Sequence, residues 1–415
     1  MYQAPRGTVD ILPEEQPYWR FVESVIAEVT RLYGYQRIDS PTFEETGLFT
    51  RSVGEGTDLV DKEMYTFDDK GGKSMTLRPE GTASVCRAYI QHGMANLPQP
   101  VKLYYVTPVF RYERPQAGRF RQHHQFGCEC FGEDDPAIDA EVIDLAWRFY
   151  KTLGLKNINL NLNSIGCKEC RPAYLNILQD YYRQHIDNLC ADCKTRLEKN
   201  PLRLLDCKQE SCQHIADDAP RSVDALCPAC AGHFDKLQKY LKALDIPYII
   251  NNRLVRGLDY YTRTIFEVQP EAEGSQSALG GGGRYDGLIE QLGGKPTPAL
   301  GFGLGIERII LNIKKENVKI PAPSPPAAFI AFLGDAAQVT ALKLAADLRK
   351  AGIGVVSAAG VKSLKAQLRQ ANTLGVCYTI IIGEDEVKAG TATLRNMSDA
   401  TQKTVALSEV LSRLK

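Results

Sequence analysis

The chain has 415 residues, of which 44% are hydrophobic and 24% charged, a composition typical of a globular protein with two or three domains. Lys and Arg together number 50, as do Asp and Glu, so the formal net charge is zero and any nucleic acid must bind to local basic patches. There is no run of about 18 apolar residues and no basic-then-apolar leader, so we expect a cytoplasmic protein without membrane contact.

The first hundred or so residues alternate helical and strand-like patterns. Residues 14–33 have apolar positions at helical spacing, which predicts a helix. Residues 63–79 predict a β-hairpin around the turn DDKGG. The next segment, 80–91, predicts a helix whose first turn holds Glu80 and Thr82 beside the end of that hairpin.

Residues 104–131 predict an antiparallel pair of strands joined by a mobile basic loop. Four arginines stand at the end of the first strand and along the loop, where guanidinium groups suit phosphates: Arg111, Arg114, Arg119 and Arg121. On the second strand Gln125, Gly127 and Glu129 share one face, which predicts a floor for a small polar molecule. The alternative is a solvated hairpin with a charged tip.

The middle of the chain is rich in cysteine. A helix at 136–152 and a strand at 158–164 precede a mostly helical, Cys-rich segment at 167–242. Eight of the twelve cysteines form close pairs: Cys167/Cys170, Cys190/Cys193, Cys207/Cys212 and Cys227/Cys230. In a cytosolic chain such pairs favour metal binding over disulfides, and four thiolates would make a closed structural zinc site. The alternative is reduced thiols that pack as small apolar side chains.

A proline-rich linker at 321–327 marks the clearest domain boundary. Beyond it, strand-like segments alternate with helical stretches at 336–351 and 362–374, which predicts a small α/β domain at 328–415. Lys362, Lys365 and Arg369 recur at helical spacing, and such a basic face can contact an RNA backbone, although it is more often merely solvated.

Six segments together resemble class II aminoacyl-tRNA synthetases, and in detail the histidyl-tRNA synthetase family. They are 5–13 (PRGTVDILP), 77–82 (LRPEGT), the hairpin 104–131, 254–267 (LVRGLDYYTRTIFE), 280–286 (GGGGRYD) and 299–308 (ALGFGLGIER). The resemblance implies an α+β fold: a class II catalytic domain at 1–320 with an antiparallel sheet core and the 167–242 segment as a helical insertion. It also implies an anticodon-binding domain at 328–415 and a homodimer, with Pro41 at the dimer interface. It requires no metal at the cysteine pairs.

The same resemblance implies a histidine–tRNA ligase, which activates L-histidine with ATP to histidyl-adenylate and transfers it to the 3′ end of tRNA(His). Magnesium is expected with the ATP phosphates. The resemblance places Arg111 and Arg256 as catalytic cations at the α-phosphate and Arg308 at the γ-phosphate, with Gly301, Gly303 and Gly305 close to the nucleotide. From the residues alone, Arg256 could equally be a loop cation and Arg308 a surface helix residue.

For histidine, the resemblance implies a pocket built around Glu80, Gly81, Thr82, Gln125, Glu129, Tyr260, Tyr261 and Tyr285. Glu80, Thr82 and Gln125 would serve the amino group. Glu129 and Tyr261 would bracket the imidazole ring, and Tyr260 and Tyr285 would close the pocket. Arg114 and Gln116 are expected near the acceptor end of the tRNA. Because aromatic residues in strands usually just pack, buried tyrosines without a ligand are the alternative.

Two other functions fit parts of the sequence. One is the histidine-binding regulatory subunit of ATP phosphoribosyltransferase, which shares the fold without aminoacylation. It would be expected to lack the carboxy-terminal domain and several phosphate-binding arginines, both of which are present here. The other is an RNA-binding or zinc-dependent interaction protein, which accounts for the cysteine pairs but leaves the histidine-pocket residues without a purpose.

Overall fold

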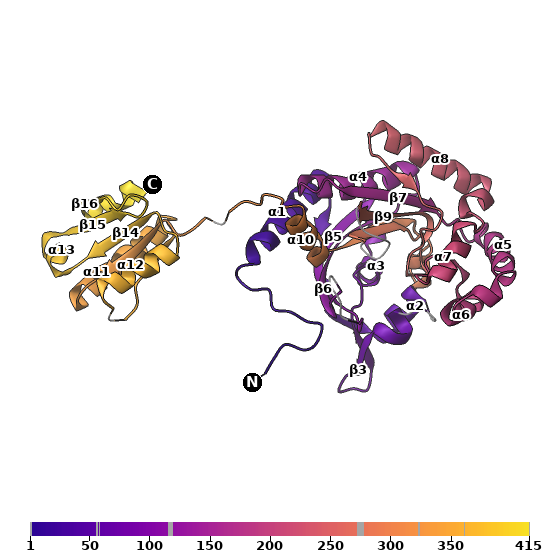
Figure 1. Ribbon diagram of the computed structural model, residues 1–415, viewed down its shortest axis with the longest axis horizontal. Coiled ribbons are helices and arrows are strands. Elements are labelled where there is room, and N and C mark those ends of the chain that lie inside the picture. Colours follow the sequence, from indigo (N-terminus) through magenta and orange to yellow (C-terminus); the bar gives the residue numbers. More distant parts are fainter. Residues whose placement is uncertain are drawn as a thin grey trace. The chain divides into compact units, whose positions relative to one another are not determined.

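The computed structural model describes residues 2–54, 57, 59–114, 119–271, 278–322, 324–360 and 362–414. The chain divides into two units, Met1–Ile320 and Pro321–Lys415. The first unit is built on a mostly antiparallel sheet and the second is a smaller α/β unit (Figure 1), so the predicted fold class is confirmed. No helix in the described part of the chain is long and apolar enough to cross a bilayer.

An eight-stranded sheet forms the centre of the first unit. Its order across the sheet is β1 (Gln36–Arg37), β5 (Val101–Phe110), β6 (Gln122–Phe131), β11 (Ala299–Gly305), β10 (Gly280–Arg284), β9 (Thr262–Pro270), β7 (Ile158–Ser164) and β8 (Ile249–Ile250). The short edge strands β1 and β8 pair in parallel with their neighbours, and the other pairs are antiparallel. A second sheet of three strands contains β2 (Phe43–Glu45), β4 (Ser74–Leu77) and β3 (Tyr65–Asp68).

Helices of the first unit cover the sheet and form the insertion. Those outside the insertion are α1 (Gln16–Leu32), α2 (Thr46–Val53), α3 (Thr82–Gln91), α4 (Pro136–Thr152), α9 (Leu288–Gln291) and α10 (Ile306–Lys315). The insertion contains α5 (Arg171–Arg183), α6 (Ala191–Lys199), α7 (Glu210–Asp217) and α8 (Pro228–Ala243), which lie together at one end of the unit (Figure 1). Most residues of the segment 167–242 therefore lie in helices.

The alternation of side chains along β6 divides the unit into a core and a site. Phe126 and Cys128 point into the main hydrophobic core, where they join residues of α1, α4, α8 and α10. Gln125, Gly127 and Glu129 occupy the opposite face, as the sequence predicts, because successive side chains of a strand point to opposite sides. The predicted hairpin is confirmed as β5 and β6, although residues 115–118 of its loop lie outside the described residues.

The second unit has a five-stranded sheet in the order β13 (Val355–Ser357), β12 (Ala328–Phe332), β14 (Tyr378–Ile382), β15 (Thr391–Asn396) and β16 (Gln402–Ala406). Its helices are α11 (Asp335–Lys350), α12 (Leu364–Thr373), α13 (Glu384–Ala389) and α14 (Val410–Leu414). The strands β12, β13 and β14 are parallel, and buried residues such as Phe329, Ile330 and Ile380 form this unit's own core.

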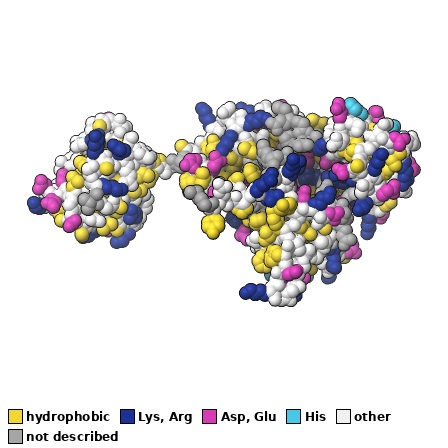
Figure 2. All heavy atoms as spheres, turned by 60° about the horizontal axis from the view of Figure 1, so that its bottom comes forward, with side chains coloured by type: hydrophobic (Ala, Val, Ile, Leu, Met, Phe, Trp, Pro, Cys, Tyr) yellow, Lys and Arg dark blue, Asp and Glu magenta, His cyan; other side chains and the backbone are white. Residues whose placement is uncertain are grey.

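The predicted basic helix face in the second unit is shorter than expected. Ser363 caps α12, because its side chain accepts a hydrogen bond from the N–H of Ala366 at 3.3 Å, so the helix begins at Leu364. Lys362 therefore precedes the helix, and only Lys365 and Arg369 share its surface. The visible face of this unit carries acidic as well as basic side chains (Figure 2).

Candidate active site

A cavity of about 550 Å³ lies over the polar face of the large sheet. Eight of the residues expected at the site line it: Glu80, Thr82, Arg111, Gln125, Arg256, Tyr260, Tyr261 and Gly303. They belong to four segments that are far apart in the chain, namely the start of α3, the β5–β6 hairpin, the segment before β9, and β11. Only the fold brings these residues to one place.

The remaining expected residues lie beneath or beside this cavity. Glu129 and Tyr285 are buried under it, with 0% and 1% of their surface exposed. Gly305 and Arg308 line an adjoining cavity of about 330 Å³, which shares Arg111, Gln125, Arg256 and Gly303 with the first, so the two form one cleft. Arg114 is exposed and lines neither cavity, and Gln116 lies outside the described residues.

Glu129 is the centre of a buried hydrogen-bond network. Its Oε1 accepts from the hydroxyl of Thr82 at 2.8 Å and from that of Tyr105 at 3.1 Å, and its Oε2 accepts from the hydroxyl of Tyr285. Burial raises the pKa of Glu129 to about 8, although the hydrogen bonds from Tyr285 and Thr82 oppose the rise. The carboxyl group can therefore gain or lose a proton near neutral pH as its surroundings change.

Glu80 caps α3, which corrects the predicted start of that helix. Its Oε2 accepts a hydrogen bond from the N–H of Thr82 at 2.6 Å, and its Oε1 accepts one from the N–H of Ala83 at 2.8 Å. Glu80 thus precedes the helix rather than standing in its first turn, because its carboxylate satisfies N–H groups that the helix leaves unpaired. Burial raises the pKa of Glu80, although the two N–H donors favour the ionised carboxylate and oppose this rise.

Tyr105 is a site residue that was missed from the sequence. Its ring lies against two glycines: a Cβ at Gly81 would come 2.2 Å from the ring, and one at Gly127 would come 2.3 Å from it. Its hydroxyl donates a hydrogen bond to Glu129. The ring therefore sets the depth of the polar floor, the surface formed by Gln125, Gly127 and Glu129. The alternation of β5 was the available signal, since it places Tyr105 on the same face as the residues opposite it on β6.

The glycines of β11 make room for side chains from β6. A Cβ at Gly303 would lie 2.3 Å from Nε2 of Gln125, and one at Gly301 would lie 1.8 Å from Oε2 of Glu129. The amide oxygen of Gln125 also accepts a hydrogen bond from the N–H of Gly81 at 2.9 Å. By contrast, apart from Gly305 itself and its two chain neighbours, no described residue has an atom within 4 Å of a Cβ built at Gly305, so there is space for a ligand beside the backbone.

Three tyrosines form the wall next to this floor. The ring of Tyr260 lies 4.7 Å from that of Tyr261 and 5.5 Å from that of Tyr285, measured between centroids. The guanidinium carbon of Arg256 lies 5.9 Å from the centroid of Tyr261. The three expected tyrosines therefore pack in a row. Tyr261, at one end, contacts both Tyr260 and the guanidinium group of Arg256.

The cations at the other end of the cleft create a positive region. Nε of Arg111 donates a hydrogen bond to the carbonyl oxygen of Pro79 at 2.8 Å, and Nη1 of Arg308 donates one to the carbonyl oxygen of Ala278 at 2.8 Å. Burial, followed by the charges of Arg111 and Arg308, lowers the pKa of His123 to about 3. Burial is the main cause of this neutral histidine, and the two neighbouring cations that add to it indicate a place where an anion would be stabilised.

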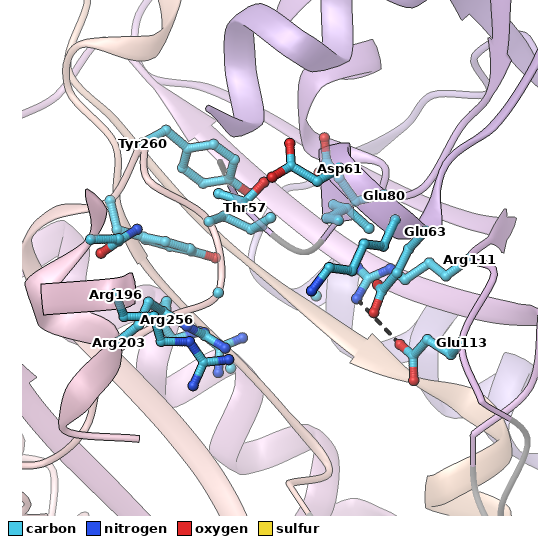
Figure 3. A pocket seen from close by; sticks show the side chains of 18 of the residues that line it. Thr57, Asp61, Glu63, Glu80, Arg111, Glu113, Arg196, Arg203, Arg256 and Tyr260 are labelled. Carbon is cyan, nitrogen blue, oxygen red and sulfur yellow. Dashed lines mark ion pairs between the residues drawn. The ribbon is translucent and has the colours of Figure 1, made fainter. Parts of the chain in front are cut away.

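The insertion adds basic residues that were also missed. Arg196, Lys199 and Arg203 line the same cavity as Arg256. In Figure 3, Arg196 and Arg203 lie beside Arg256 on one side of the cavity, and Arg111 and Glu113 lie on the opposite side. The spacing of three and four residues between the three basic residues was the available signal, although α6 ends at Lys199 and Arg203 lies in a separate 3-10 turn, Pro201–Leu204. The fold was needed to show that this basic edge faces the cavity.

Comparison with known proteins gives consistent matches over both units. Residues 7–309 match a family model described as "Histidyl-tRNA synthetase", and residues 327–415 match one described as "Anticodon binding domain". A histidine–tRNA ligase of Dehalococcoides mccartyi is 60% identical over 415 residues, which cover 100% of this chain and 99% of the relative. One from Desulforamulus reducens is 52% identical over 411 residues, covering 99% of this chain and 98% of the relative. The solved structure of apo histidyl-tRNA synthetase from S. aureus is 38% identical, covers 100% of both chains and gives a TM-score of 0.84.

Proposed function

The chain belongs to the histidyl-tRNA synthetase family, and from this premise we propose how its residues carry out the family's reaction. The reaction is the ATP-dependent activation of L-histidine to histidyl-adenylate, followed by transfer of the histidyl group to the 3′ end of tRNA(His). One observation supports this function above all: a polar floor for an amino acid and a set of cations for phosphates share one cleft.

Activation requires a carboxylate oxygen of histidine to attack the α-phosphorus of ATP, while the bond to pyrophosphate breaks. Negative charge gathers on the phosphoryl oxygens, so fixed cations aimed at them lower the barrier. We assign this role to Arg111 and Arg256, which line the same cavity from opposite sides (Figure 3). Arg308 in the adjoining cavity binds the γ-phosphate, and the open backbone at Gly305 and neighbouring Gly303 accommodate the nucleotide. ATP enters as its Mg²⁺ complex.

Histidine is held by the floor and the tyrosine wall. Glu80, Thr82 and Gln125 bind the amino group beside the turn at Gly81, where all three line the cavity. Glu129 and Tyr261 accept or donate hydrogen bonds at the two imidazole nitrogens, and Tyr260 and Tyr285 close the pocket. An amino acid without these nitrogens would leave Glu129 and Tyr261 without the hydrogen bonds that the imidazole ring makes. Such a loss can reduce activation by about 10⁴-fold.

Transfer requires a ribose hydroxyl at the tRNA 3′ end to attack the adenylate carbonyl, with release of AMP. The exposed Arg114 and the neighbouring Gln116 are proposed to contact the acceptor end, and the second unit is proposed to bind the anticodon. Such a second unit is what the regulatory-subunit alternative would be expected to lack. A pure interaction protein, in turn, would have no use for the histidine floor.

The enzyme is proposed to act as a homodimer in the cytoplasm, where its tRNA substrate is found. Exposed aromatic rings on the three-stranded sheet are consistent with a partner: Phe43 and Phe67 are 49% and 43% exposed, and their centroids lie 6.0 Å apart. Metal at the cysteine pairs would have no open position for chemistry, so it would take no part in the reaction.

Pyrophosphate exchange into ATP, measured with each amino acid in turn, tests the function. We expect exchange only when histidine is present. Equal exchange with several amino acids would refute the assignment, and so would histidine binding without any exchange, which is the behaviour of a regulatory subunit. Charging of tRNA(His) with labelled histidine then tests the second step.

A further inference from the structure

The eight paired cysteines of the insertion gather into two groups of four. Cys167 and Cys170 meet Cys227 and Cys230, and this group is called the outer tetrad. Cys190 and Cys193 meet Cys207 and Cys212, and this group is called the inner tetrad, because its residues lie between those of the outer one in the sequence. Within each tetrad, all four Sγ atoms lie within 4.8 Å of one another. Each tetrad therefore joins two pairs that are separated along the chain.

We propose that the insertion is folded around two structural zinc ions, one bound by the four thiolates of each tetrad. Zinc prefers four sulfur ligands in a tetrahedron with Zn–S distances of about 2.3 Å, which puts the sulfur atoms about 3.8 Å apart. The measured Sγ–Sγ distances agree: Cys167 lies 3.8 Å from Cys170 and 3.9 Å from Cys227, and Cys190 lies 3.8 Å from Cys207.

Backbone N–H groups point at the sulfur atoms, as they do when thiolates are stabilised. The N–H of Cys167 donates to Sγ of Cys170 at 3.3 Å, the N–H of Cys193 donates to Sγ of Cys190 at 3.4 Å, and the N–H of Cys190 donates to Sγ of Cys212 at 3.3 Å. All twelve cysteines are free thiols, and a disulfide would join only two sulfurs, at about 2.05 Å.

The small core of the insertion gives a physical reason for metal. Beside leucines such as Leu178 and Leu197, three of the eleven buried residues in its cluster are cysteines of the inner tetrad: Cys193, Cys207 and Cys212. Subdomains of fewer than about 80 residues commonly gain stability from a structural metal, because a small core alone supplies little. Thiols packed only as small apolar groups would not need to meet in two sets of four.

Each tetrad lies near one contact between the insertion and the segment that carries Tyr260 and Tyr261. The outer tetrad stands at the start of α5, where Arg171 donates a hydrogen bond to the carbonyl oxygen of Tyr261 at 2.5 Å. The inner tetrad stands at the start of α6, and Asn200 after that helix donates to Asp259 at 2.8 Å. Metal loss is therefore expected to loosen the segment that carries Tyr260 and Tyr261 as well as the basic edge at Arg196.

Elemental analysis of the purified full-length chain tests the proposal without reference to catalysis. We expect about two zinc ions per chain and, by X-ray absorption, four sulfur neighbours at about 2.3 Å around each. Cys170→Ser and Cys193→Ser should each lower the content to about one zinc. Cys377→Ser, which removes an exposed cysteine of the second unit, should leave it at two. If a ligand variant fails to fold, the zinc content and absorption spectrum of the parent chain still decide.

Three results would overturn the proposal. They are a metal-free chain whose eight thiols all react with a thiol reagent in the native state, intact-mass evidence of disulfides among these cysteines, and iron in place of zinc. Because metal content is measured independently, it also separates this inference from the proposed function. A chain that holds two zinc ions but shows no histidine-dependent exchange would retain the sites and lose the enzymatic assignment.

Discussion

Nη1 of Arg256 lies 2.5 Å from Oε2 of Glu267, a side chain of the neighbouring strand β9. The glycines of strand β10 leave room for this guanidinium group. A Cβ at Gly281 would lie only 2.8 Å from Nη1 of Arg256, so a larger residue there would displace the arginine. Both partners are mostly buried, with 20% and 14% of their side chains exposed, so the pair is weakly screened by solvent. Glu267 thus holds the guanidinium group of Arg256 at the wall of the cavity.

The first prediction concerns Arg256 itself. Arg256→Ala should slow formation of histidyl-adenylate by about 10²-fold or more, because a cation aimed at the developing phosphoryl charge is lost. Single-turnover measurement of adenylate formation isolates this step. Arg37→Ala is the matched control, since Arg37 is exposed and forms an ion pair with the exposed Asp39. An Arg256 variant with the parent's turnover number would remove this residue from the mechanism.

The second prediction treats Glu267 as a positioning residue that acts through Arg256. Glu267→Gln should reduce adenylate formation less than Arg256→Ala does, since the cation remains but is less firmly held. In the double variant, the Glu267 change should add little to the loss from Arg256→Ala, because residues that act through one another are not additive. Additive losses in this double-mutant cycle would mean that Glu267 acts independently of Arg256.

The third prediction follows from the raised pKa of Glu129. In the unfolded chain this carboxyl group has an ordinary pKa near 4.5, whereas in the folded chain its pKa is about 8. Between these values the folded state binds a proton that the unfolded state has released, so ionisation of Glu129 increasingly opposes folding as the pH rises. Glu129→Gln cannot ionise. Its free energy of unfolding relative to the parent should therefore increase between about pH 4.5 and pH 8.

Denaturant unfolding of both proteins across this pH range measures the effect. Glu14→Gln serves as the control because Glu14 is exposed at the surface, and its difference from the parent should stay flat. A difference for Glu129→Gln that does not change with pH would show that Glu129 is already ionised in the empty pocket.

The fourth prediction concerns the space around Tyr105. Gly127→Ala places a methyl group 2.3 Å from the Tyr105 ring, so the ring must move away from Glu129. We expect a loss of about 1–3 kcal/mol in the free energy of unfolding, together with a raised KM for histidine. Gly287→Ala is the matched control, because no described atom lies within 4 Å of its Cβ and its φ is −91°. Equal stability of the two variants would contradict the close packing of Tyr105.

The sequence determined a large part of the architecture and the site. Hydrophobic periodicity located α4 and β7 at their observed positions, and the basic hairpin was recognised from its turn residues and strand-like flanks. The family motifs identified eight of the residues that line the cavity. This was possible because local backbone preferences and motif spacing are written in neighbouring residues.

Other features depended on contacts between distant segments. The capping role of Glu80, the place of Tyr105 between two glycines and the direction of Arg196 and Arg203 could not be read from local patterns. The helix α13 was not predicted either; with six residues, Glu384–Ala389, it is too short for a clear hydrophobic period.

The cysteines show most clearly the difference between local sequence patterns and contacts of distant segments. Spacing alone identified four pairs, but four pairs can combine into two tetrads in more than one way. The nested arrangement, in which Cys167 and Cys170 meet Cys227 and Cys230 across the inner tetrad, was decided by the packing of α5 to α8. Residue spacing shows only which cysteines of one short segment lie close together. Which distant pair they meet depends on the free energy of the whole folded chain.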